Sequence, residues 1–125
     1  MQLTRVFFFL FVMHLGAEVK AGKPLTLKPD QDCLIHVSQA SLDEGKRGES
    51  ALLYVTVDGK KLVIGTLSQG NIPQISFDLV FEKEFELSHS LERGSVQFRW
   101  LQIPQHRPIS FYLSAYFSVW VFVLY

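Results

Sequence analysis

The chain has 125 residues, 48% of them hydrophobic, which is enough for one domain with a substantial core and too little for two. Twelve basic and twelve acidic residues cancel, so the overall charge does not supply the attraction that drives nucleic-acid binding, and direct DNA binding is disfavoured. Cys33 is the only cysteine, so the sequence excludes an intramolecular disulfide and a structural zinc site built on thiolates, and it favours a reducing compartment.

Residues 1–17 form an apolar leader. They read MQLTRVFFFLFVMHLGA, with Arg5 as the single charge and the small residues Gly16 and Ala17 at the end. A positive residue, an apolar run and small residues in this order are the outline of a secretory signal peptide. The run is too short for a membrane-spanning helix, which needs about 20 apolar residues. A signal peptide and a buried or accidental apolar leader are both open interpretations of this segment.

Residues 18–100 carry the pattern of a β domain. Apolar and polar residues alternate in short runs, while glycine, proline and charged residues separate the runs, and no helical periodicity is present. Six to eight antiparallel strands at this spacing predict an all-β sandwich or jelly roll. The expected strands are short edge strands near Val19 and at 25–27, then strands at 33–40, 51–57, 62–67, 74–89 and 96–100.

The centre of this domain, residues 51–89, is expected to form an antiparallel β-meander. Asp58-Gly59 lies between two alternating runs, and this dipeptide favours a two-residue hairpin because both turn positions need a positive φ angle. The hairpin therefore joins the strands expected at 51–57 and 62–67.

The run 74–89 is expected to be one strand with an acidic face. Asp78, Glu82, Glu84 and Glu86 recur at even spacing, so their side chains would share one side of that strand. A like-charged strand face is typical of a solvated edge that resists aggregation. A docking surface for basic partners such as histones is the functional alternative.

The sequence holds no catalytic, phosphate-binding or metal-binding motif. Its four histidines are scattered and no third ligand accompanies His36 and Asp78, so neither a metal site nor a cofactor site is predicted. His36 shares a strand face with Leu34 and Ser38. A histidine and an aspartate on different strands can meet across a sheet and act as a general base and its orienting carboxylate. The alternative is that His36 is an ordinary surface residue.

Residues 101–125 form an apolar tail. From Pro108 it reads PISFYLSAYFSVWVFVLY, an uncharged stretch that meets the minimum length of a membrane helix but is rich in aromatic and β-branched residues. Three interpretations are open: a tail anchor, a final strand, and sequence that does not belong to the folded domain. The abrupt stop at Tyr125 without a polar cap favours the third.

Four stretches of the chain resemble one known family. They are GAEVKAGKPL (16–25), DCLIHVSQASLD (32–43), VTVDGKKLVIGTLSQ (55–69) and PQISFDLVFEKEFELSHS (73–90). Over roughly residues 16–98 the chain closely resembles the N-terminal nucleoplasmin-like domain of the plant-specific HD-tuin histone deacetylases, a domain also found at the front of some nuclear immunophilins. The resemblance implies an all-β, nucleoplasmin-like jelly-roll sandwich of about eight antiparallel strands that assembles into a pentamer.

The resemblance also implies a function. It points to a chromatin protein of the nucleus and nucleolus that acts on core histones by deacetylation and represses rRNA genes. Family members' activity is attributed to a histidine in the CLIH segment and an aspartate in the FDLVF segment, which fall on His36 and Asp78 here. The implied partners are core histones and further copies of the chain, without direct nucleic-acid binding, and a membrane only if the leader or tail is functional.

Two other functions stay open. A non-catalytic, oligomeric histone-binding chaperone or scaffold explains the same residues as the enzyme does. A secreted or membrane-tethered β-sandwich, routed to the secretory pathway by the leader, is the interpretation that the apolar ends favour.

Both ends of the chain depart from the family pattern. Family members open with Met-Glu-Phe-Trp directly before the glycine that matches Gly16, where this chain has Val12–Leu15, and the last strand diverges after Phe98. The acidic segment, basic nuclear-localisation stretch and zinc finger of longer members are also missing. The simplest hypothesis is an altered transcript or gene model. It predicts a transcript of the same locus that encodes Met-Glu-Phe-Trp before Gly16, and full-length cDNA carrying only the apolar leader would refute it.

Overall fold

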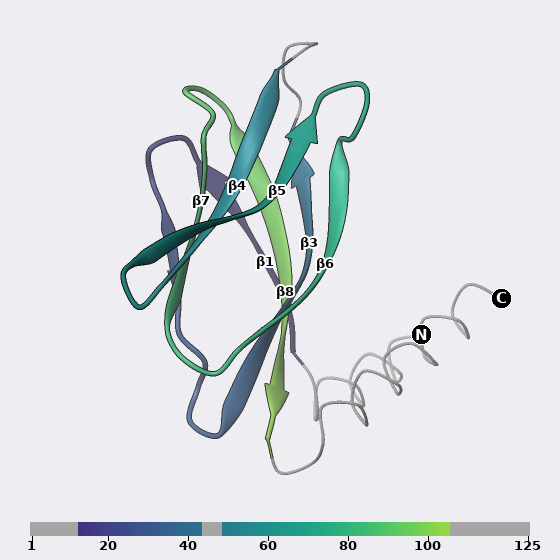
Figure 1. The fold of residues 1–125 in the computed structure, drawn as a ribbon. Helices are drawn as coiled ribbons and strands as arrows, with labels where there is room; N and C mark the ends of the chain where they lie inside the picture. The colour runs from purple at the N-terminus through teal and green to yellow at the C-terminus, as the bar shows by residue number, and fades with distance from the viewer. Residues whose placement is uncertain (1–12, 44–48, 106–125) are drawn as a thin grey trace, which may run out of the picture.

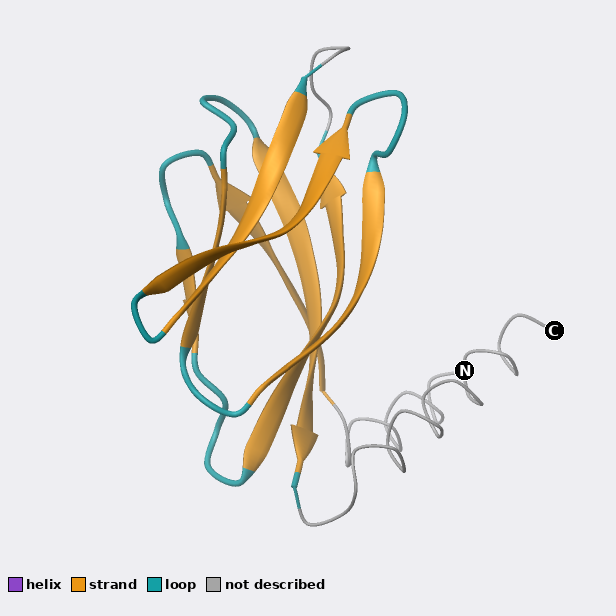
Figure 2. Ribbon diagram, viewed as in Figure 1, coloured by secondary structure: helices purple, strands orange, loops and turns teal. Residues whose placement is uncertain are grey.

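The computed structural model describes residues 13–43 and 49–105, and this part of the chain folds into strands only (Figures 1 and 2). No helix within the described ranges is long and apolar enough to cross a membrane. The expected all-β fold of eight antiparallel strands is confirmed. The strands are β1 (Met13–Lys20), β2 (Leu25–Leu27), β3 (Cys33–Leu42), β4 (Ser50–Val57), β5 (Lys60–Ser68), β6 (Gln74–Phe81), β7 (Phe85–His89) and β8 (Ser95–Pro104).

The strands form two antiparallel four-stranded sheets that face each other as a sandwich (Figure 1). Sheet A has the order β1-β8-β3-β6 and sheet B the order β2-β7-β4-β5. The chain changes sheet at most connections, which is the topology of a jelly roll. The expected meander over 51–89 is therefore wrong: β4 and β5 pair as a hairpin, but β6 crosses to sheet A and β7 returns to sheet B.

The predicted hairpin turn is confirmed. Val57 pairs with Lys60, and the two residues between them, Asp58 and Gly59, have φ angles of 51° and 78°. Two successive positive φ angles define the turn whose twist matches that of the flanking strands. Asp58 tolerates this conformation better than most residues, and glycine adopts it without a steric penalty.

The expected strand over 74–89 is broken in the structure. β6 ends at Phe81, residues 82–84 turn, and β7 begins at Phe85 in the other sheet. The rings of Phe81 and Phe85 stack across this turn with centroids 3.9 Å apart and planes 16° from parallel. Both rings reach the same core because the chain folds over between them. The alternation of apolar and polar residues continues unchanged through these three turn residues, so the sequence pattern did not show the break.

Strands β1 and β8 run side by side at the ends of the described chain. Met13 pairs with Gln102, so β1 begins inside the segment assigned to the leader and β8 continues into the segment assigned to the tail. Residues 1–12 and 106–125 lie outside the described residues. The structure therefore does not test the interpretations of the apolar run in the leader or of the stretch from Pro108.

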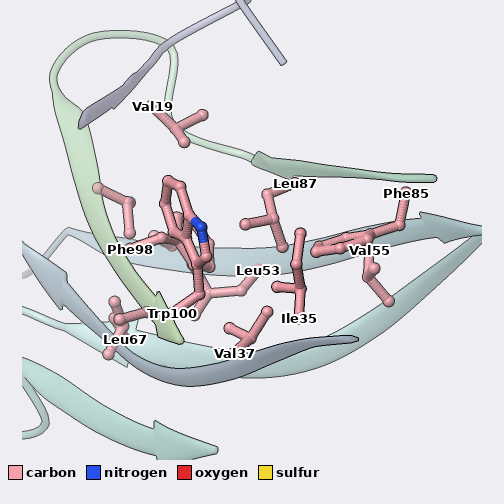
Figure 3. Packing of buried hydrophobic residues seen from close by; sticks show 13 residues of the cluster. Val19, Ile35, Val37, Leu53, Val55, Leu67, Phe85, Leu87, Phe98 and Trp100 are labelled. Carbon is pink, nitrogen blue, oxygen red and sulfur yellow. The ribbon is translucent and has the colours of Figure 1, made fainter. Parts of the chain in front are cut away.

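The core lies between the two sheets (Figure 3). Phe98 and Val37 from sheet A meet Leu53, Phe85 and Leu87 from sheet B, and all five are almost fully buried. Side chains at alternate positions of sheet A point the other way, out of the sandwich. This outer face of sheet A carries the candidate site.

Candidate functional site

The structure brings His36 and Asp78 together. β3 and β6 are neighbours in sheet A, and His36 lies directly opposite Val80, two residues from Asp78. The side chains of His36 and Asp78 meet diagonally across the two strands, with 2.6 Å between the His36 Nε2 and Asp78 Oδ1 atoms. The residues are 42 positions apart in the sequence, so only the pairing of β3 with β6 makes this contact.

An irregularity in the sheet lies beside this pair. Two residues of β6, Phe77 and Asp78, stand opposite the single Ser38 of β3, because the register shifts between Val37 and Gln39. The same shift makes Ser38 an extra residue against β8, and the Ser38 hydroxyl donates a hydrogen bond of 3.1 Å to the Arg99 carbonyl. Such bulges twist a strand locally and redirect its side chains.

The two side chains of the pair differ sharply in exposure. His36 points away from the sandwich core, yet its side chain is only 9% exposed, whereas that of Asp78 is 85% exposed. Apolar residues flank the imidazole on the same outer face: Leu34 two positions earlier, Leu101 on β8 and Val80 on β6. His36 is therefore not the ordinary surface histidine that the sequence left open.

The hydrogen bond fixes which nitrogen of neutral His36 carries the proton. A carboxylate can only accept, so His36 Nε2 donates to Asp78 and the lone pair lies on Nδ1. Nδ1 is buried and has no hydrogen-bond partner. Asp78 thus holds the ring as an orienting carboxylate would, but the nitrogen that would act as a base is shielded from solvent.

No group of three or more metal-ligating side chains gathers anywhere in the described ranges. His14 lies across Leu101 from His36, since Leu101 pairs with both. Burial lowers the pKa of the His14 imidazole because its charged form is poorly solvated there. His14 and His36 therefore lie on the same outer face of sheet A, on either side of Leu101.

The acidic stripe expected on one strand does not form. Glu82 and Glu84 lie in the turn between β6 and β7, Glu86 lies on β7 in sheet B, and Asp78 lies on β6 in sheet A. The turn between β6 and β7, residues 82–84, lies at the lower end of the sandwich in Figure 1, near the β2–β3 loop. Asp30 and Asp32 of that loop bring further acidic residues to the same end, and Lys28 and Lys83 offset part of this negative charge.

Sequence reasoning missed His89, which ties the two sheets together. His89 Nδ1 accepts from the Leu91 backbone N–H at 3.2 Å, so Nε2 is the protonated nitrogen and donates to the Val19 carbonyl at 2.7 Å. His89 is at the end of β7 and Val19 is on β1 of the other sheet. No local signal could have found this contact, because its partners are 70 residues apart.

The geometry defines a jelly-roll sandwich with a histidine–aspartate pair on the outer face of one sheet. The family comparison agrees with this class: the model of the nucleoplasmin-like domain matches residues 15–98. The chain belongs to the nucleoplasmin-like domain family.

Two similar proteins are plant histone deacetylases that carry the name HDT1. The chain is 56% identical over 85 residues to histone deacetylase HDT1 of Solanum chacoense, covering 66% of this chain and 32% of that protein. It is 55% identical over 95 residues to histone deacetylase HDT1 of Arabidopsis thaliana, covering 74% of this chain and 39% of the relative. The chain thus spans about a third of the length of the relatives that it matches.

Two solved structures share the fold. The Drosophila NLP core, whose crystal structure is described as giving insight into pentamer formation and histone binding, superposes with a TM-score of 0.65 at 21% identity, over 74% of this chain and 96% of that one. The nucleoplasmin-like N-terminal domain of Drosophila FKBP39 superposes with a TM-score of 0.57 at 20% identity, over 78% of this chain and 95% of the other.

Proposed function

We propose that this chain is a histone-binding nuclear module of the HD-tuin type, acting in histone deacetylation and in repression of rRNA genes in the nucleolus. The observation that carries the proposal is the 55% identity to the Arabidopsis relative over 95 residues, together with the nucleoplasmin-like match over residues 15–98, which contains His36 and Asp78. The module assembles into a pentamer, as the Drosophila NLP core does.

The acidic lower end of the sandwich is the proposed contact with histones. Glu82 and Glu84 are exposed there, and a ring of copies repeats the same surface around its axis. Attraction between these carboxylates and basic histone segments weakens as salt screens it.

A charge-neutralising variant tests this contact. Glu82→Gln with Glu84→Gln is expected to weaken binding to core histones about tenfold at moderate salt, measured by titration against labelled histones. Glu49→Gln with Glu92→Gln is the matched control, because it removes the same charge from exposed residues. One precedes β4 and the other lies in the β7–β8 loop, and both segments are at the opposite end of the sandwich in Figure 1. Equal weakening by both variants would show that only net charge matters, and unchanged binding by the first would exclude the lower end.

The enzymatic part of the proposal assigns deacetylation to the His36–Asp78 pair. Deacetylation adds water to the acetyl carbonyl carbon and breaks the bond to the lysine nitrogen, which leaves acetate and a free amine. His36 Nδ1 would take a proton from the attacking water and return it to the leaving lysine nitrogen, and Asp78 would hold the ring through Nε2. This role requires the buried Nδ1 atom to become accessible in the substrate complex.

An assay on acetylated histone peptide tests the pair. Asp78→Asn keeps a hydrogen-bond acceptor for His36 but removes the charge, and His36→Ala removes the proposed base. If the pair is catalytic, both variants lose turnover about a hundredfold or more, and His36→Ala does so with unchanged histone binding and native mass. Turnover equal to wild type in both variants would exclude the pair from catalysis.

A non-catalytic histone-binding scaffold is the second candidate, and the burial of Nδ1 favours it. In this case His36 and Asp78 stabilise the outer face of sheet A, and the module accompanies a deacetylase rather than acting as one. Purified wild-type chain would then bind histones and release no acetate from the peptide.

A further inference from the structure

A ring of copies needs two different surfaces on each subunit. Cyclic assemblies are closed by head-to-tail contacts, in which one patch of a subunit meets a different patch of the next subunit. The described surface offers one such patch on the outer face of each sheet.

The first patch lies on sheet B. Tyr54 and Val63 are cross-strand partners of β4 and β5, and Leu52 lies two positions before Tyr54 on the same face. Leu52 is 39% exposed and Val63 is 59% exposed, which is high for apolar side chains on a sheet. The Lys61 ammonium lies 4.3 Å from the centre of the Tyr54 ring and gives the patch one positive charge. We call these four residues the β4–β5 patch.

The second patch lies on sheet A. Val80 is 41% exposed and lies beside His36, and Asp78 follows on the same face with its side chain 85% exposed. One oxygen of Asp78 accepts from His36, and the exposure of the carboxylate leaves the other oxygen accessible to a second donor. We call Val80 and Asp78 the β6 patch.

We propose that the β4–β5 patch of one copy docks on the β6 patch of the next, with Lys61 paired to Asp78 across the contact. The proposal rests on the pentamer proposed above. A second copy is the occupant that fits because each patch joins apolar area to a single charge, and the two charges are opposite. Asp78 then holds His36 of its own copy and Lys61 of the neighbour. This contact covers the His36–Asp78 pair, so it agrees with the scaffold role and not with the catalytic one.

Charge reversal tests the contact through the native mass. Lys61→Asp and Asp78→Lys each place like charges together and are expected to raise the concentration at which the assembly half dissociates by about tenfold or more. The double variant restores opposite charges in every contact and is expected to return to the wild-type mass. Measurement is by light scattering after size exclusion over a dilution series, with circular dichroism to confirm that each variant is folded.

Matched controls separate this contact from general charge effects. Lys60→Asp is the control for Lys61→Asp, because it reverses the charge one residue away on the opposite face of β5. Glu82→Lys is the control for Asp78→Lys, because it reverses a charge beyond the end of β6. Both controls are expected to keep the wild-type mass. A mixture of the two single variants adds a further test. Opposite charges meet only where the two variants alternate, and a ring of five members must contain at least one contact between like charges, so the mixture is expected to recover the wild-type mass less fully than the double variant.

The outcomes distinguish the two proposals. If wild-type chain is not pentameric, the assembly under Proposed function fails. If the wild-type chain is pentameric and both single reversals keep its mass, the pentamer stands and this contact is wrong. Failure of the double variant to recover assembly while remaining folded would also overturn the pairing of Lys61 with Asp78.

Discussion

At the scale of single residues, two histidines have opposite hydrogen-bonding states. His36 has one nitrogen bound to Asp78 and the other buried without a partner, whereas both nitrogens of His89 are bound. An imidazole with both nitrogens hydrogen-bonded, as in His89, suits a structural role. An imidazole with one unbonded nitrogen, as in His36, can still bind or react through that nitrogen.

Removing the His89 tie should destabilise the fold. His89→Ala leaves the Val19 carbonyl and the Leu91 N–H without their partners, which costs about 1–3 kcal/mol of the free energy of unfolding. Urea denaturation measures this loss. Gln39→Ala, which removes an exposed side-chain hydrogen bond to Gln74, is the control and should change stability by less than about 0.5 kcal/mol. An equal effect of both changes would refute the special role of His89.

Cys33 should react slowly with alkylating agents. Burial raises the pKa of its thiol, and the nearby charges of Asp30 and Asp32 raise that pKa further, so less thiolate is present at neutral pH than in an unfolded chain. Iodoacetamide labelling followed by mass spectrometry is expected to be slower for the folded chain than for the chain in urea. Asp32→Asn, which suits the positive φ angle there, should speed labelling of the folded chain, and a slower rate would contradict this account.

At the scale of strands and turns, the β4–β5 hairpin depends on Gly59. Gly59→Ala places a Cβ atom on a residue with a φ angle of 78°, where it meets no neighbouring atom within 4 Å. The cost is therefore backbone strain alone, about 1 kcal/mol. Thermal unfolding measures it, and Lys60→Ala in the adjacent strand position is the control. Unchanged stability of the Gly59→Ala chain would mean that the turn has another conformation in solution.

Several elements followed from the sequence because their signals are local. The two-residue period separated Ile35 and Val37 from His36 on opposite faces of one strand, and the structure shows that the first two face the core. Asp58-Gly59 located the hairpin. The break after Phe81 was not predictable, since a short turn between sheets keeps the alternation intact. Which sheet each strand joins, and hence the meeting of His36 with Asp78, depends on contacts between residues far apart in the sequence.

The burial of His36 also lay beyond the sequence. Its strand neighbours Leu34 and Ser38 give no indication of what covers that face, and only the register with β6 and β8 shows that Val80 and Leu101 flank the ring. The acidic residues were misplaced for the same reason. Residues at even spacing share a face only if the strand is continuous, and this strand ends at Phe81.

At the scale of the whole molecule, the fold, the candidate site and the proposed assembly are connected. The side chains that face the core determine which residues lie on the outer faces of the two sheets. These outer faces carry the two patches, and the β6 patch contains Asp78. The proposed histone-binding module and the proposed subunit contact both rest on this arrangement.

The native mass of the purified chain at micromolar concentration, measured by light scattering or native mass spectrometry, tests this account most directly. The expected result is an assembly of five times the 14.3 kDa chain mass. A mass of 14.3 kDa at every concentration tested, with a folded β-rich spectrum, would contradict it.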